Sequence, residues 1–221
     1  MSVEQLKYNF SDDQTGVHRL ILDRIPPNSR VLDVGCATGY LGQRLVLSGC
    51  EVWGIEPDKT SYEHALNKGY KNIINLSVEA ALESDIIKNE KFDRIIVADV
   101  LEHLVNPILV LNSLKIHSKP DGKILVSLPN IAHYSIRLAL LFGKFDMVDT
   151  GILDKTHLHF YTLKAMYKLL EDGGWKIEEV RPRGDLERWF RKIGLEKVGK
   201  FFQFIFQKIF AYQFIIIARP L

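Results

Sequence analysis

Short apolar runs typical of β-strands alternate with helix-like segments along most of this chain. The run Ile95-Ile96-Val97-Ala98 is continuously apolar, as expected of a strand that is covered on both faces. Strands that alternate with helices favour a doubly wound α/β sheet with helices on both faces. The 221 residues suit one such domain, so we expect a single domain over residues 1–221.

The predicted elements follow from this periodicity and from the Gly and Pro residues that separate the segments. Pro120-Asp121-Gly122, for example, predicts a turn into the fifth strand. The predicted strands are Arg30–Gly35, Glu51–Ile55, Asn72–Leu76, Phe92–Ala98, Gly122–Ser127, Trp175–Arg181 and Tyr212–Ala218. The predicted helices are Gln14–Ile25, Tyr40–Ser48, Ser61–Lys68, Glu79–Glu83, Asn106–Ile116, Ala132–Phe142 and Leu163–Asp172.

Composition excludes several classes of protein. Apolar residues make up 47% and charged residues 25% of the chain, which is ordinary for a globular domain. The net charge of +2 gives no reason to expect a nucleic-acid partner. Cys36 and Cys50 form neither a disulfide framework nor a zinc set, which suits a reducing compartment. The sequence contains no apolar run of about 18 residues, the length that would predict a transmembrane segment. We therefore expect a cytoplasmic protein.

The strongest chemical signal is the segment Val31–Tyr40, which reads V-L-D-V-G-C-A-T-G-Y. A predicted strand enters a glycine-containing loop that leads directly into a predicted helix, and open α/β sheets bind cofactors at such strand ends. The spacing Gly35-x-x-x-Gly39-x-x-Gly42 does not match the G-x-G-x-x-G motif of dinucleotide-binding folds. These residues can be interpreted as a cofactor-binding loop or, alternatively, as a plain structural turn.

This segment resembles the first motif, D-x-G-x-x-x-G, of the class I S-adenosylmethionine-dependent methyltransferases. The resemblance implies a Rossmann-like, seven-stranded mixed sheet with an antiparallel last strand, which dinucleotide-binding folds generally lack. It also implies an acid after the second strand that accepts hydrogen bonds from the cofactor's ribose, although NAD enzymes place an acid there too. The implied cofactor-binding residues are Gly35, Cys36, Ala37, Gly39, Tyr40, Glu56, Pro57, Val78, Glu79, Ala98, Asp99 and Val100.

The fourth predicted strand is followed by D-V-L-E-H-L, residues 99–104. In a helical turn Asp99, Glu102 and His103 would share one face, an arrangement that suits a divalent cation. The stretch resembles the ubiquinone-biosynthesis O-methyltransferases, in which the related motif implies magnesium, and also many metal-independent methyltransferases. Asp99 is shorter than the Glu of the first group, and Mg²⁺ prefers oxygen ligands. We expect no metal, with Mg²⁺ on these three residues as the alternative.

Two later segments carry candidate acceptor-binding groups. His133 ends S-L-P-N-I-A-H, and Asp154, His157 and His159 lie in G-I-L-D-K-T-H-L-H-F. The pair of segments resembles methyltransferases found with bacterial cell-surface polysaccharide genes, which implies a sugar hydroxyl as acceptor. Because His can take a proton from an alcohol at neutral pH, we predict catalytic roles for these four residues, with His157 as first choice. A purely structural role for each His is the alternative.

Two peripheral segments complete the picture. Residues 1–25 are predicted to form a lid helix over the cofactor, or to pack on the surface. Residues 182–209 are predicted to form an amphipathic helical insertion before the last strand, since aromatic residues there alternate with basic ones. The alternatives for this insertion are a helix packed on its own sheet, a substrate cap, a homodimer face, and contact of residues 185–208 with a membrane surface.

The sequence therefore predicts methyl transfer from S-adenosylmethionine to a hydroxyl of a sugar or other small molecule. A non-catalytic, methyltransferase-like binding module and a nicotinamide-dependent oxidoreductase are the competing functions. The oxidoreductase is disfavoured by the missing G-x-G-x-x-G motif.

Overall fold

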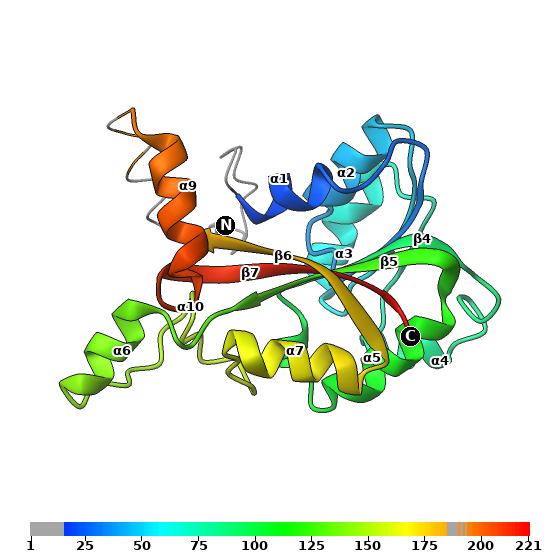
Figure 1. The fold of residues 1–221 in the computed structure, drawn as a ribbon. Helices are drawn as coiled ribbons and strands as arrows, with labels where there is room; N and C mark the ends of the chain where they lie inside the picture. The colour runs from blue at the N-terminus through cyan, green and yellow to red at the C-terminus, as the bar shows by residue number, and fades with distance from the viewer. Residues whose placement is uncertain (1–15, 185–189, 191, 193) are drawn as a thin grey trace, which may run out of the picture. The chain divides into compact units, whose positions relative to one another are not determined.

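A computed structural model describes residues 16–184, 190, 192 and 194–221 of the chain (Figure 1). The strands are β1 (Arg30–Val34), β2 (Glu51–Ile55), β3 (Asn72–Ile74), β4 (Phe92–Ala98), β5 (Ser118–Pro129), β6 (Trp175–Gly184) and β7 (Ala211–Pro220). The helices are α1 (Val17–Leu22), α2 (Tyr40–Leu47), α3 (Lys59–Ala65), α4 (Val78–Glu83), α5 (Pro107–Ile116), α6 (Tyr134–Leu141), α7 (Leu163–Asp172), α9 (Glu196–Ile205) and α10 (Gln207–Phe210), with short 3₁₀ turns η1 (Leu66–Lys68) and η2 (Leu101–His103).

The seven strands form one sheet in the order β3-β2-β1-β4-β5-β7-β6. β1 pairs with β2 and β2 with β3 in parallel, whereas β7 runs antiparallel to both β5 and β6. This confirms the predicted mixed sheet with an antiparallel last strand. The chain divides into two compact units. The first extends to Ile96 and includes Ile116–Gly122; the second comprises Val97–Lys115 and the chain from Lys123 onward.

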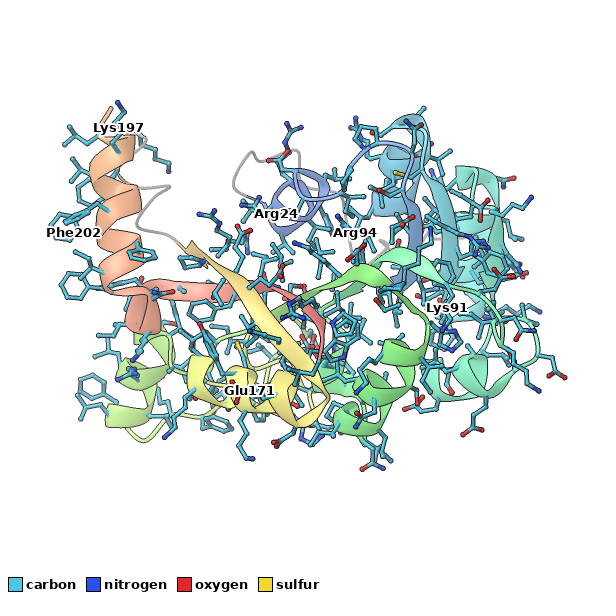
Figure 2. All side chains as sticks on the ribbon, turned by 45° about the vertical axis from the view of Figure 1, so that its right-hand side comes forward. Arg24, Lys91, Arg94, Glu171, Lys197 and Phe202 are labelled. Atoms are coloured by element: carbon cyan, nitrogen blue, oxygen red, sulfur yellow. The ribbon has the colours of Figure 1, made fainter. Side chains whose placement is uncertain are left out.

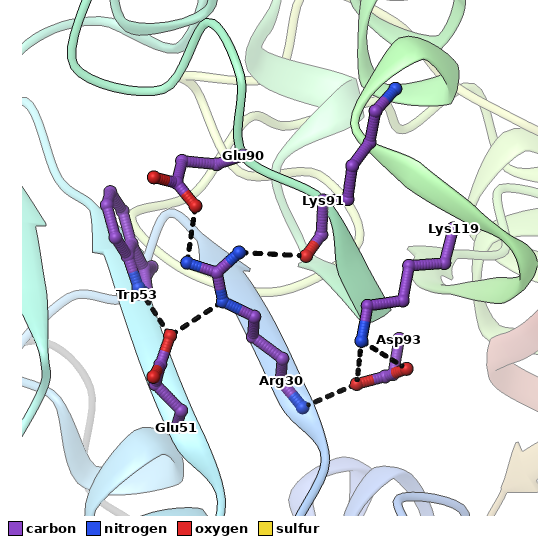
Figure 3. A network of polar contacts seen from close by, with 7 residues as sticks. All are labelled: Arg30, Glu51, Trp53, Glu90, Lys91, Asp93 and Lys119. Carbon is purple, nitrogen blue, oxygen red and sulfur yellow. Dashed lines mark hydrogen bonds and ion pairs between the residues drawn. The ribbon is translucent and has the colours of Figure 1, made fainter.

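In the first unit, a polar network joins the chain at the starts of its strands (Figure 3). The Arg30 guanidinium pairs with Glu51 at 2.6 Å and also with Glu90, and its planar group lies over the rings of Trp53 and Phe92. A second part of the network holds the Arg30 amide and the Lys119 ammonium on the Asp93 carboxylate. These contacts fix the strand starts, whereas the glycine loop follows the end of β1.

In the second unit, β7 is continuously buried from Phe214 to Ala218, because both faces are covered. Helix α7 buries Leu163, Met166, Leu169 and Leu170, which recur at helical spacing. The Thr162 side chain accepts a hydrogen bond from the Ala165 amide at 3.3 Å, as a helix N-cap does. The amphipathic pattern thus gives both the position of this helix and the face that it buries.

Most predicted elements are found with ends shifted by one to a few residues, and two of these shifts have a clear physical cause. Pro120-Asp121-Gly122 is not a turn before the fifth strand but lies inside β5, near its start, where a strand tolerates Pro. The third helix begins at Lys59 rather than Ser61, because the Asp58 carboxylate accepts the Ser61 amide hydrogen at 2.8 Å and caps the helix. The Asp58 cap directly after Pro57 thus sets the start of α3.

Parts of the peripheral predictions lie outside the described residues. This applies to residues 1–15 of the predicted lid and to residues 185–189, 191 and 193 of the predicted insertion. The single-domain, lid and insertion assignments stay predictions. Among the described helices, none has the length and hydropathy needed to cross a bilayer.

Candidate functional site

The glycine loop after β1 adopts a conformation that only certain residues tolerate. Gly35 has φ +69° and Gly39 has φ +78°, in the left-handed region that favours glycine. The amides of Gly35 and Cys36 both donate hydrogen bonds to the Ile55 carbonyl, at 2.8 and 3.1 Å. The loop is therefore tied to the end of β2, next to the predicted ribose-binding acid.

Glu56 joins the glycine loop to the segment after β2. Its carboxylate accepts the Ala37 amide hydrogen and the Asp58 amide hydrogen, both at 2.8 Å. Ala37 has φ +47°, an uncommon conformation for a residue with a side chain, and such strain collects at functional sites. Burial raises the pKa of Glu56, and the two amide hydrogen bonds oppose that rise. Asn75 donates to the Glu56 and Pro57 carbonyls and holds the backbone there.

Three further predicted cofactor residues begin helices of the first unit. Tyr40 is the first residue of α2, with its ring partly exposed and 4.9 Å from the Lys68 ammonium. Val78 is buried and Glu79 is exposed in the first turn of α4, which Ser77 caps. Their contacts with a cofactor stay predictions.

Tyr70 is a residue of this region that sequence reasoning missed. A Cβ atom added at Gly42 would lie 2.0 Å from the Tyr70 hydroxyl oxygen, and Cβ atoms at Gly39 and Gly54 would lie 3.1 Å from its ring. The hydroxyl donates a hydrogen bond to the Asp33 carboxylate at 2.7 Å. Gly39, which the resemblance implies for cofactor contact, and Gly42 thus make room for this half-buried ring. No local pattern around Tyr70 signals that role.

In the second unit, Asp99 follows β4 with a strained backbone. Its φ is +56°, and its Oδ1 accepts hydrogen bonds from Ser127, at 2.9 Å, and from Gln213. The helical conformation does not extend back to Asp99, because the η2 turn covers only Leu101–His103. The expectation that Asp99 shares a ligand face with Glu102 and His103 is therefore wrong.

His157, rather than Asp99, lies beside Glu102 and His103 as the third potential metal ligand. Ligand atoms of Glu102, His103 and His157 lie within 4.8 Å of one another. The Glu102 carboxyl is buried, and neither oxygen has a hydrogen-bond partner among the described residues. Burial, followed by the charge of Asp99, raises the pKa of Glu102 well above its usual range.

The segment 154–159 holds His157 in one orientation. Asp154 accepts the Thr156 amide and hydroxyl hydrogens at 2.8 and 2.6 Å, which closes a tight turn. The Nδ1 atom of His157 lies 3.1 Å from the Ile152 carbonyl oxygen. Since a carbonyl can only accept, Nδ1 carries the proton and Nε2 keeps its lone pair, 4.0 Å from Glu102. Burial lowers the pKa of His157, so its imidazole is neutral at pH 7.

The other two candidate histidines have different surroundings. His133 is buried and caps α6, with Nδ1 at 2.7 Å from the Ser135 hydroxyl. His159 has a buried Nε2 with no hydrogen-bond partner among the described residues. The capping contact gives His133 a structural role, and a catalytic role for either residue stays a prediction.

Comparisons with known proteins decide the family. The family described as "Methyltransferase domain" matches residues 7–180, more than half of the chain. This chain belongs to the methyltransferase-domain family. The resemblance to class I S-adenosylmethionine-dependent methyltransferases is thereby confirmed, whereas a link to polysaccharide genes is not.

Individual relatives carry names consistent with this family. The "Ubiquinone biosynthesis O-methyltransferase" of Rickettsia prowazekii (strain Madrid E) is 26% identical over 183 residues, 81% of this chain and 66% of that protein. The protein of that name from Haemophilus ducreyi is 32% identical, over 76% of this chain and 65% of its own. The crystal structure of a SAM dependent methyltransferase from Archaeoglobus fulgidus is 18% identical, covers 91% of this chain and 90% of its own, and has a TM-score of 0.64. The chain spans about half to two thirds of the length of the first curated relatives it matches.

The donor set of Glu102, His103 and His157 fits magnesium poorly. Glu102 offers one carboxylate, while His103 and His157 offer imidazole nitrogens, and Mg²⁺ requires oxygen ligands in octahedral geometry. Asp99, the other carboxylate of the motif, accepts hydrogen bonds from Ser127 and Gln213. We therefore assign no step of the reaction to a magnesium ion.

Because Gly42 lies so close to Tyr70, we expect Gly42→Ala to destabilise the protein, although replacing a helical Gly by Ala usually stabilises. Gly42→Ala in a helix normally stabilises by about 0.8–1 kcal/mol. Here the added Cβ would overlap Tyr70, so we expect the free energy of unfolding to fall by about 1–3 kcal/mol. Denaturant unfolding measures this change, and Gly42→Ala in a Tyr70→Ala background is the control. A Gly42→Ala protein more stable than the parent would contradict the packing described.

Asp33 predicts a specific pH dependence of stability. Burial raises the pKa of its carboxyl from 3.8 to about 7, and the Tyr70 hydrogen bond opposes part of that rise. The folded state thus keeps a proton that the unfolded state releases near pH 4, so stability falls as pH rises from about 4 to 7. Asp33→Asn lacks this ionisation. We expect its free energy of unfolding, relative to the parent, to increase over that range by a few kcal/mol. If the free energies of unfolding of the parent and Asp33→Asn changed equally with pH, the raised pKa of Asp33 would be refuted.

Proposed function

We propose that this chain transfers a methyl group from S-adenosylmethionine to a hydroxyl oxygen of a sugar or other small molecule. The observation that carries the proposal is the Glu56 carboxylate, which two backbone amides hold against the glycine loop. In this family position a fixed carboxylate can accept hydrogen bonds from both ribose hydroxyls. Family membership supports S-adenosylmethionine as donor, and action in the cytoplasm is part of the proposal.

In the proposed reaction S-adenosylmethionine supplies an electrophilic methyl group on a sulfonium. An alcohol is a poor nucleophile at pH 7, so the protein must remove its proton as the new bond forms. His157 is the proposed acceptor of that proton, because its Nδ1–H is directed to the Ile152 carbonyl and Nε2 keeps a lone pair. The rest of the rate enhancement comes from orienting the hydroxyl and excluding water.

Two candidate acceptors each have support. The sugar hydroxyl rests on the resemblance of residues 127–133 and 151–160 to polysaccharide-associated methyltransferases. The names of the relatives, each a ubiquinone biosynthesis O-methyltransferase, favour a ubiquinone precursor as the second candidate. Both candidates are hydroxyl compounds, so the same chemistry serves either.

An acceptor screen tests the proposal. The full chain is incubated with S-adenosylmethionine labelled in its methyl group and with nucleotide-sugars, glycans or hydroxylated ubiquinone precursors. We expect label in one acceptor class, on an oxygen, with formation of S-adenosylhomocysteine. Cofactor binding without transfer to any acceptor would instead support a non-catalytic, methyltransferase-like binding module.

A further inference from the structure

Helix α9 exposes apolar side chains that a helix of a globular protein normally buries. Phe201, Phe204 and Ile205 are 62%, 64% and 51% exposed, whereas Gly199 is buried. Helical spacing places the first three residues on one side of the helix, which we call the Phe201 face. An amphipathic helix that packs on its own sheet would turn this face inward. Packing of another side of α9 on its own sheet would leave this face uncovered.

An aromatic series attaches α9 to the rest of the second unit along another side of the helix. The Phe202 ring stacks on Phe206 at 6.1 Å, and Phe206 meets Phe210 edge-on at 6.3 Å. Phe210 in turn contacts Tyr134 at the start of α6, a helix with no buried residue. The Phe201 face is thus presented outward from a helix whose other side is held by ring contacts.

The charge around the Phe201 face is positive. Lys197 is exposed one helical turn before Phe201, and the exposed Lys192 and Lys208 precede and follow α9 in the chain (Lys197 and Phe202 are labelled in Figure 2). In the sequence, residues 190–210 hold five basic residues and one acid, Glu196. A lysine next to an apolar face can extend its ammonium to anionic headgroups while its methylene groups stay on the apolar side.

We propose that the Phe201 face docks this protein on an anionic lipid surface. A helix with aromatic side chains on one face and lysines beside them binds in the interface plane by inserting the rings and pairing the lysines with acidic headgroups. A second copy of the chain is the other candidate. A twofold contact through this face would bring together two copies of a segment with five basic residues and one acid, so most of the positive charges would have no carboxylate to pair with. The charges therefore favour lipid.

Vesicle flotation tests the proposal with the full chain. The probes are vesicles of phosphatidylcholine alone and of phosphatidylcholine with about one third phosphatidylglycerol. We expect binding to the anionic vesicles that weakens with added salt, and little binding to the neutral ones. The double variant Phe201→Ser/Phe204→Ser should lower partitioning at least about tenfold, and Lys197→Glu should lower it severalfold.

Matched controls replace residues of the same type elsewhere. Leu47→Ser removes an exposed apolar side chain from α2, and Lys88→Glu reverses an exposed lysine. Both should bind vesicles as the parent does, and thermal unfolding checks that each variant is folded. The proposal fails if the parent does not bind anionic vesicles, or if folded Phe201→Ser/Phe204→Ser binds them equally well. It also fails if light scattering shows a dimer that this variant dissociates, since the occupant would then be a second copy.

Discussion

Glu56→Ala is expected to weaken S-adenosylmethionine binding by a factor of about 10²–10⁴. A hydrogen bond to a charged group contributes about 1.5–3 kcal/mol, and the proposed role gives Glu56 two such bonds to the ribose. The substitution also removes the carboxylate that accepts the Ala37 and Asp58 amide hydrogens. These two hydrogen bonds fix the loop before any ligand binds. Isothermal titration calorimetry measures the dissociation constant directly.

Two controls separate this effect from a general loss of structure. Glu83→Ala removes an exposed carboxylate from α4 and should leave affinity unchanged. Glu56→Gln keeps the size of the side chain and one accepting oxygen, so its loss should be intermediate. A folded Glu56→Ala protein with affinity within threefold of the parent would rule out the proposed ribose contact.

His157→Ala is expected to lower turnover by about 10²–10⁴ while leaving the affinity for S-adenosylmethionine nearly unchanged. General base assistance contributes a factor of this size, and His157 is the neutral imidazole with an available Nε2 lone pair. The rate is measured with the acceptor identified in the screen, at saturating donor. A loss confined to turnover distinguishes a proton acceptor from a residue that binds the cofactor.

The matched control for His157 is His64→Ala, which removes an exposed imidazole from α3. Since the His157 side chain is only 6% exposed, the free energy of unfolding of His157→Ala must be measured alongside its rate. Unchanged turnover in the folded variant would remove His157 from the base role and leave His159 or His133 to be tested.

Much of the fold could be predicted from periodicity alone. The apolar runs that became β1, β4 and β7 are buried on both faces, and such strands are recognisable without any contact information. The loop after β1 was also predictable, since its glycines adopt positive φ angles that other residues tolerate poorly. Boundaries were less certain where a single cap decides them, as Asp58 does for α3.

The remaining features depend on contacts between residues that are distant in sequence. Tyr70 reaches Asp33 across 37 positions and lies against glycines from two other segments, which no local pattern reveals. The spacing of Asp99, Glu102 and His103 predicts a shared face only in a regular helix. Asp99 has a left-handed backbone conformation, so its side chain does not lie on that face. The outward Phe201 face was equally hidden, since an amphipathic pattern says that a helix has an apolar side but not what covers it.

The central claim is that the chain uses S-adenosylmethionine, and calorimetric titration tests it most directly. The full chain is titrated with S-adenosylmethionine and, separately, with NADH, each with and without magnesium. We expect S-adenosylmethionine to bind with one-to-one stoichiometry, magnesium to change nothing, and NADH to give no heat of binding. Binding of NADH, or of neither ligand, would contradict the proposed function.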